Sequence, residues 1–177
     1  MTKETYIQLA VREFHRTKAL ADGAIAQITQ KQFFAAPSEG DNSVAIIVKH
    51  VGGNLLSRWT NFLTSDGEKP ERNRDVEFEI TAGDTQQSLI AQWESGWAAL
   101  FSAIEPLSGA DLERMVTIRG ESLTVLQAIN RQLTHYSYHV GQIVYVAKHY
   151  AGGSWRTLSV AKGKSAEFNA KPTKYIG

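Results

Sequence analysis

The chain has 177 residues, of which 42% are hydrophobic, 21% are charged and none is cysteine. This length lies within the roughly 100–200 residues of a typical domain and predicts a single domain, and the missing cysteines exclude disulfides and cysteine-ligated metal sites. The formal net charge of +1 argues against a nucleic-acid partner, because such a partner requires a strongly basic surface.

The sequence also indicates where the protein resides. Its first segment, residues 1–18, mixes charged and apolar side chains and lacks the hydrophobic stretch of a signal peptide. No apolar run approaches the roughly 20 residues that a membrane-spanning helix needs. The absence of cysteine agrees with a reducing compartment. We therefore expect a cytoplasmic protein with no membrane partner.

Four long stretches carry apolar residues three or four positions apart, which is the spacing of an amphipathic helix. They are residues 3–30, 44–64, a stretch between a cap at Asp84 and Pro106, and residues 123–150. The polar residues 65–83 predict a long surface loop, and the alternation in 114–118 before the turn Arg119-Gly120 predicts a short β-hairpin. The pattern favours an all-α protein, a four-helix bundle with one long crossover loop.

The predicted bundle occupies residues 1–150, and residues 151–177 form a C-terminal extension. This tail is rich in basic residues, and we expect it to lie extended over the bundle or over a partner subunit. The basic residues are Arg156, Lys162, Lys164, Lys171 and Lys174, against one acidic residue, Glu167. Within the second helix, Gly52 and Gly53 are unusual because glycine destabilises a helix by about 1 kcal/mol relative to alanine. They either admit a close neighbour, a helix or a ligand, or are simply tolerated.

Two histidines, His135 and His139, stand four residues apart in the last helix. This spacing places both imidazoles on one helix face, where both can reach a metal ion at about 2.0–2.1 Å. His50, near the edge of the apolar stripe of the second helix, is the candidate third ligand. Three neutral imidazoles leave coordination positions open, which is typical of catalytic sites. The alternative interpretation, inert hydrogen-bonded histidines at helix borders, remains open at this point, and we place His15 and His149 outside the site.

Other chemistries have weaker support. Tyr136 stands where an H-E-x-x-H metalloprotease has its glutamate, and no acidic residue precedes a histidine by three, as di-iron bundles require. The sequence Gly163-Lys164-Ser165 resembles the end of a phosphate-binding loop, but Leu158 occupies the position of its first glycine. A haem held by two histidines is conceivable, although no axial-ligand motif favours it.

Several residues near the predicted metal face have either packing or functional interpretations. Tryptophans at helical positions are more often core residues than ligand cages; here they are Trp59, Trp93 and Trp97. Three tyrosines flank the face and favour packing over a hydroxyl beside a metal-bound water: Tyr136, Tyr138 and Tyr145. Arg58 is compatible with binding an anionic substrate or with a surface salt bridge. Asn54 and Gln142 lie one turn from proposed ligands and could orient a histidine or a water.

The run Ile129-Asn-Arg-Gln-Leu-Thr-His135-Tyr-Ser-Tyr-His139-Val-Gly-Gln-Ile143, together with Ile46-Ile-Val-Lys-His50-Val, resembles the DinB-like (DinB/YfiT) superfamily. Arg119-Gly-Glu-Ser-Leu-Thr-Val and Trp155 to Asn169 are similar to one uncharacterised branch of it. The resemblance covers nearly the whole chain. It implies an up-up-down-down four-helix bundle, often a homodimer, with a divalent metal held by His50, His135 and His139. Despite the superfamily's name, nothing implies DNA polymerase activity.

The resemblance indicates a metal site more directly than it indicates a function. Some members are thiol S-transferases that attach bacillithiol, mycothiol or glutathione to an electrophilic small molecule, and one relative isomerises maleylpyruvate. A metal held by neutral imidazoles would favour a thiol as thiolate, and a chain without cysteine would take that thiol as a low-molecular-weight cofactor.

Two other functions remain open: a metal-dependent hydrolase, which lacks an obvious carboxylate base, and a non-catalytic, metal-stabilised stress or binding protein. Three imidazoles suit zinc, nickel, iron or copper. No catalytic residue beyond the three ligands is assigned.

Overall fold

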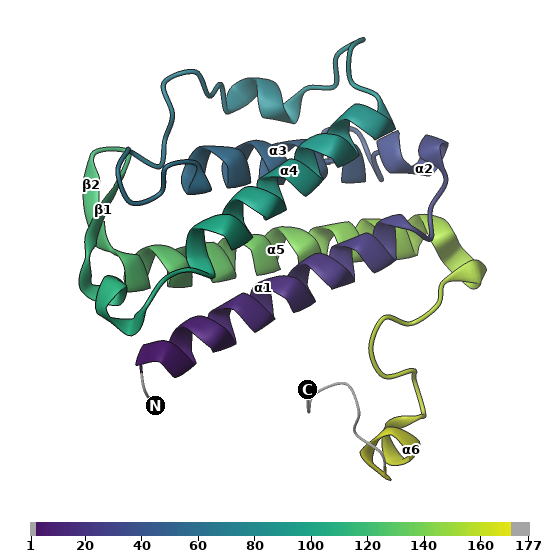
Figure 1. Cartoon of the computed structure of the whole chain (residues 1–177). Helices are drawn as coiled ribbons and strands as arrows, with labels where there is room; N and C mark the ends of the chain where they lie inside the picture. The colour runs from purple at the N-terminus through teal and green to yellow at the C-terminus, as the bar shows by residue number, and fades with distance from the viewer. Residues whose placement is uncertain (1–2, 171–177) are drawn as a thin grey trace.

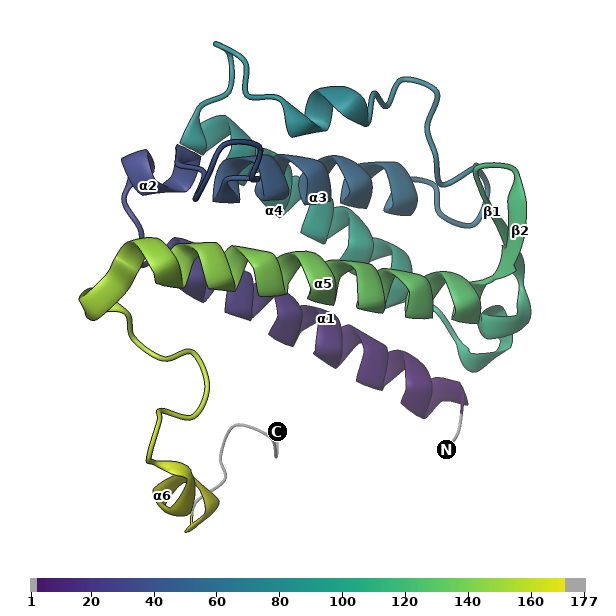
Figure 2. The same ribbon diagram turned by 180° about the vertical axis from the view of Figure 1, so that it is seen from behind.

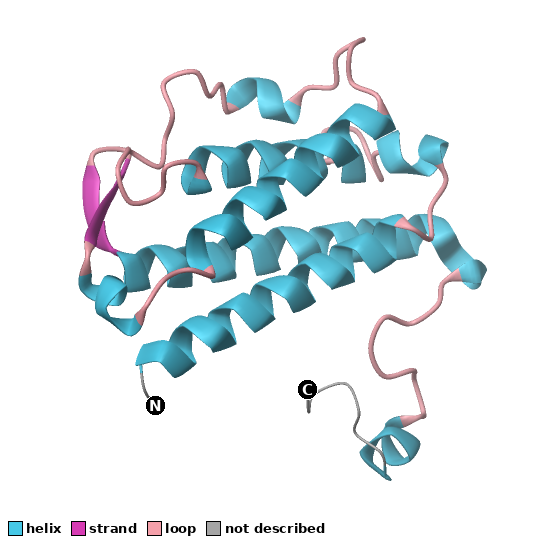
Figure 3. Cartoon of the chain, in the orientation of Figure 1, coloured by secondary structure: helices cyan, strands magenta, loops and turns pink. Residues whose placement is uncertain are grey.

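The computed structural model describes residues 3–170 of the chain, with side chains from Tyr6 onward. The protein is mostly helical, as predicted, with one small antiparallel hairpin at one end (Figure 1 and Figure 3). The long helices are α1 (Lys3–Ile25), α3 (Val44–Trp59), α4 (Gln86–Ile104) and α5 (Val125–Ala151). Shorter elements are the helices α2 (Gln30–Phe34) and α6 (Ser165–Ala170) and the 3-10 turns η1 (Asp75–Phe78), η2 (Gly109–Glu113) and η3 (Gly152–Ser154). In the described part of the chain, no helix has both the length and the apolar character to cross a membrane.

Side-chain caps explain where the helices begin and correct two predicted boundaries. The helix predicted over 3–30 ends at Ile25, and Thr29 begins the separate helix α2 with a capping box. Thr85, one residue after the predicted cap, accepts a hydrogen bond from the backbone N–H of Ser88 at the start of α4. The helix predicted to reach residue 64 ends at Trp59, because Thr60 is extended and Asn61 has a φ of 52°.

The hairpin pairs β1 (Met115–Ile118) with β2 (Glu121–Thr124), which confirms the short hairpin expected before the last helix. Its turn residues, Arg119 and Gly120, both have positive φ, at 57° and 75°, as a two-residue type I′ turn requires. Both backbone N–H groups donate to the Asp66 carboxylate, at 2.8 and 2.9 Å. The hairpin turn is thereby attached to the crossover segment, which we define as residues 60–85 between α3 and α4.

The long helices run in an up-down-down-up order, so the expected up-up-down-down order is wrong. When two helices are parallel, contacts further along one helix are also further along the other. Between α1 and α5 the contacts are Tyr6–Asn130 and then Phe14–Tyr136. Between α3 and α4 they are Gly52–Trp93 and then Leu55–Gly96. Each of these pairs is therefore parallel, and the two pairs oppose each other. The reason is visible in Figure 1: the α2 region turns compactly, so α3 begins where α1 ends, whereas the crossover segment returns along the full length of α3.

Aromatic side chains from all four long helices meet in the core. The ring of Phe14 on α1 lies 6.2 Å from Trp59 on α3, 6.4 Å from Trp97 on α4 and 6.0 Å from Tyr136 on α5, measured between centroids. Trp59 Nε1 donates to the Tyr136 hydroxyl at 3.0 Å, which satisfies both buried polar groups. The predicted core positions of Trp59, Trp97 and Trp93 are confirmed by their burial.

The described part of the tail leaves α5 and contacts α1, which lies beside α5 in both ribbon views (Figure 2). Arg156 donates its backbone N–H to Gln27 Oε1 at 2.6 Å, and Leu158 packs against Gly23, where a Cβ atom would approach Leu158 to 2.9 Å. This beginning of the tail lies against α1 and the residues after it, whereas Ser165–Ala170 form the helix α6 in place of the expected extended segment. Lys171 and Lys174, counted among its basic residues, lie outside the described residues.

Candidate metal centre

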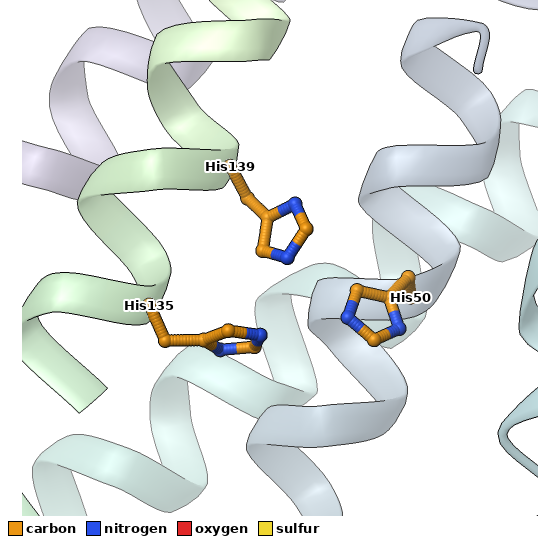
Figure 4. A group of neighbouring side chains, drawn as sticks. All are labelled: His50, His135 and His139. Carbon is orange, nitrogen blue, oxygen red and sulfur yellow. The ribbon is translucent and has the colours of Figure 1, made fainter. Parts of the chain in front are cut away.

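Three imidazoles converge between α3 and α5 (Figure 4). His135 and His139 project from successive turns of α5 toward His50 on the facing helix α3, and one potential ligand atom from each lies within 4.8 Å of the others. Ring centroids of His50 lie 5.6 Å from His135 and 4.8 Å from His139. Helices α3 and α5 are antiparallel and adjacent, which is why residues so distant in sequence meet. The structure therefore brings all three predicted ligands together.

The electrostatic environment keeps two of these histidines neutral. Burial, followed by the charges of His139 and His50, lowers the pKa of His135 to about 3. Burial is also the main cause that lowers the pKa of His139, to about 4. Neutral imidazole is the form that binds a metal ion, so both side chains are available as ligands at neutral pH.

A hydrogen-bonding defect marks the same place. His135 Nδ1 is buried and has no hydrogen-bond partner among the described residues. Buried polar atoms are nearly always satisfied, and an exception calls for an explanation such as an ion. Three converging imidazoles and this unsatisfied atom together fit a divalent metal such as zinc.

Two of the histidines are oriented by hydrogen bonds through Nδ1. Glu77 Oε2 lies 2.8 Å from His50 Nδ1, and Gln142 Oε1 lies 2.8 Å from His139 Nδ1. These bonds leave Nε2 of each ring free to bind a metal, the usual arrangement around histidine ligands. Gln142 thus has the orienting contact that its position suggested. Asn54 does not: it accepts from Tyr136 at 3.1 Å.

Glu77 is the important residue that the sequence analysis missed. It is 6% exposed, and Arg72 holds it with two parallel hydrogen bonds of 2.8 Å. Burial raises its pKa, but the hydrogen bonds from His50 and Arg72 more than compensate and hold the pKa below its usual value. Glu68 extends the network, at 3.1 Å from Arg72 and 2.9 Å from Arg58. The crossover segment, expected to be a surface loop, therefore carries buried charges that support the site.

The glycine pair of the second helix now has an explanation. Gly52 lies against α4, where a Cβ atom would come within 3.4 Å of the Trp93 backbone N. A Cβ atom at Gly53 would overlap Glu77 Oε1. The two glycines thus permit the close approach of a helix on one side and of the glutamate that orients His50 on the other.

The histidines line a pocket of about 690 Å³ that also includes Tyr138 and Arg58. Arg58 is buried and paired with Glu68, so its salt bridge is not a surface one. The three flanking tyrosines differ: Tyr136 is in the core, Tyr138 borders the pocket, and Tyr145 is 76% exposed. The pocket makes the site accessible to a small molecule.

The other two histidines lie apart from this site, as expected. His15 stacks on Phe101 with centroids 3.8 Å apart and lies 3.7 Å from Glu105. His149 is exposed near the end of α5. Each therefore offers a control for experiments on the three converging histidines.

Comparison with known proteins places the chain in a family without assigning an activity. Residues 1–164 match the family described as protein of unknown function DUF1572. The chain belongs to this family. No curated protein matches it, and neither does any solved structure. The chemistry of the DUF1572 chain must therefore be argued from its own residues.

Proposed function

We propose that this protein is a divalent-metal-dependent enzyme, a thiol S-transferase that joins a low-molecular-weight thiol to an electrophilic small molecule. The observation that carries the proposal is the convergence of three imidazoles, with ligand atoms within 4.8 Å of one another, in the wall of a pocket. When bound there, a divalent metal supplies positive charge that stabilises a thiol in its deprotonated form. The protein's own part is to hold the three imidazoles close together, with His50 oriented by Glu77 and His139 by Gln142.

The residues around the pocket favour a thiol over water as the nucleophile. Attack by water is commonly assisted by a carboxylate or histidine that removes its proton. Among the described residues that line the pocket there is no aspartate or glutamate. Glu77 is engaged with His50 and Arg72, which leaves it unsuited to act as a base. A thiol, with a reference pKa of about 8.5, ionises near neutral pH with far less assistance. A hydrolase is therefore the weaker alternative.

A purely structural metal is also less well supported. Structural sites are closed, usually with four protein ligands, whereas here three side chains converge and a pocket gives access to them. The aromatic core is a separate cluster of side chains and includes residues from all four long helices. This division of roles supports a metal that serves chemistry more than folding.

We extend the proposal to the protein's relationships and assembly. The H-x-x-x-H-x-G-Q-I motif with His50 supports membership of the DinB-like superfamily, with the long helices as its four-helix bundle. A homodimer in the cytoplasm completes the proposal. Sedimentation tests the dimer, and a monomer at micromolar concentration would contradict it.

Metal content tests the site. We expect close to one metal ion per chain in untagged wild-type protein, with zinc, nickel, iron or copper as the candidates. His50→Ala and His139→Ala should contain almost no metal. His149 is an exposed histidine on the same helix as His139, so His149→Ala is the matched control and should retain the metal. All variants should keep the far-UV circular dichroism of the wild type. Loss of that helical signal in His139→Ala would make the metal structural.

The metal-loaded protein is then tested for thiol transfer. Glutathione, bacillithiol and mycothiol are each paired with 1-chloro-2,4-dinitrobenzene, and formation of the thioether is followed by absorbance. Transfer by wild type and not by His139→Ala supports the proposal. Metal binding without transfer of any of the three thiols, combined with release of acid from ester substrates, would favour the hydrolase.

A further inference from the structure

The pocket above the histidines is strongly basic. Five arginines line it, and they come from α3, the crossover segment, the hairpin turn and α5: Arg58, Arg72, Arg74, Arg119 and Arg131. No acidic side chain lines it in the described part of the chain. The whole protein carries a net charge of only +1, so this concentration of positive charge is local.

Two carboxylates behind the pocket wall neutralise part of this charge. Glu68 contacts Arg58, Arg72 and Arg119, with N···O distances of 2.9, 3.1 and 3.2 Å. Glu77 contacts Arg72. These arginines have a structural role, because they hold the crossover segment and the hairpin turn against α3.

Arg74 and Arg131 have no such partner. Neither forms an ion pair within the described residues, and both side chains are exposed at the pocket. The guanidinium carbon of Arg74 lies 5.0 Å from the centroid of the Phe78 ring, and that ring lies 4.7 Å from the ring of His50. Arg74 is therefore close enough to influence the histidine site.

Arg131 stands on α5 one turn before His135, on the wall contributed by that helix. The two unpaired guanidiniums thus reach the pocket from two different elements, the crossover segment and α5. Guanidinium groups bind carboxylate and phosphate oxygens through two parallel hydrogen bonds. An anionic ligand would provide both of these groups with a charged partner.

We propose that this pocket selects an anionic small molecule, whose carboxylate or phosphate group is bound by Arg74 and Arg131 while the rest of the molecule reaches the three histidines. The inference rests on the proposed function, since it takes this pocket as the substrate site. It adds the chemical class of the molecule: one of the two reactants, the thiol or the electrophile, carries an anionic group.

Titration calorimetry of the metal-loaded protein with three probes tests the proposal. The probes are succinate, inorganic phosphate and succinamide, the uncharged diamide of the same carbon skeleton. We expect succinate or phosphate to bind at least about tenfold more tightly than succinamide, and the tighter of the two to identify the anionic group as a carboxylate or a phosphate. Equal binding of all three probes, or no binding of the two anions, would overturn the proposal.

Substitutions separate binding by the arginines from binding by the metal. Arg74→Gln and Arg131→Gln should each weaken binding of the preferred anion about tenfold, with unchanged metal content and an unchanged melting temperature. Arg114→Gln is the matched control, since Arg114 is exposed and lies outside this pocket; it should bind the anion like wild type. Unchanged affinity in both pocket variants would overturn the proposal.

Metal content, measured on the same samples, keeps the two proposals separate. If the wild type binds no metal, the proposed function fails, and the same titrations are made on the metal-free protein. A preference for an anion that depends on Arg74 and Arg131 would then still support the anion site. Its absence would refute that site.

Discussion

The aromatic core and the histidine pocket are adjacent, yet they are built in opposite ways. His135 and Tyr136 are consecutive residues of α5; one faces the pocket and the other lies in the core. Rings from all four long helices meet in the core, whereas the histidines come from two helices and are supported by a charged crossover segment. Stability and chemistry are therefore separable here: damage to the core should unfold the protein, and damage to the pocket should change what it binds.

The largest effect is expected for Trp97→Ala in the core. Removing this fully buried side chain leaves a cavity between α1, α4 and α5, and such truncations cost about 3–5 kcal/mol of unfolding free energy. Urea denaturation followed by circular dichroism measures the loss. Trp155→Ala, at a partly buried tryptophan of the tail, is the control and should cost much less. Equal losses in the two variants would show that the ring cluster is not the main stabilising unit.

A smaller effect, in a different quantity, is expected for Glu77→Gln behind the pocket. The amide keeps the shape but loses the charge that orients His50 and pairs with Arg72, so metal affinity should fall about 10–100-fold. Competition with a chromophoric chelator measures the affinity. Glu79→Gln, an exposed acid two residues away, should bind metal like wild type. An unchanged affinity in Glu77→Gln would remove Glu77 from the site.

The smallest effects are expected for two glycine substitutions that sharpen the comparison. A methyl group at Gly53 would push Glu77 away from His50. Gly53→Ala should therefore reduce metal affinity although it changes none of the three histidines, and the reduction should be smaller than that of Glu77→Gln. Gly141→Ala is the matched control: nothing lies within 4 Å of the position that its methyl group would take, and alanine should stabilise α5 by up to about 1 kcal/mol. Chelator competition and thermal melting measure the two changes. Identical behaviour of the two variants would contradict the contact between Gly53 and Glu77.

Much of this organisation could be predicted from the sequence. Helical periodicity located the four long helices, the alternation before Arg119-Gly120 located the hairpin, and the four-residue spacing selected His135 and His139. Boundaries at residues 25 and 59 were missed because the apolar pattern continues past them, whereas Thr29 begins a separate helix and the left-handed Asn61 follows the end of α3.

The features that could not be predicted depend on contacts that leave no periodic pattern in the sequence. The crossover segment has no repeating apolar pattern, so nothing in its sequence distinguished the buried Glu77 from its exposed neighbours. The parallel alignment of α3 with α4 likewise depends on the path of that segment. The glycine pair was the one available signal, since two adjacent glycines in a helix indicate that something comes close.

The wide separation of the ligands along the chain has a consequence for synthesis. His50 is made early, but its two partners follow only at His135 and His139, and α5 must then pack against α3 before the three imidazoles can meet. A nascent or truncated chain that ends before His139 contains at most two of these three histidines and would bind a metal ion more weakly. A metal ion that needs all three imidazoles would therefore bind only to chains that have been made past His139 and have folded.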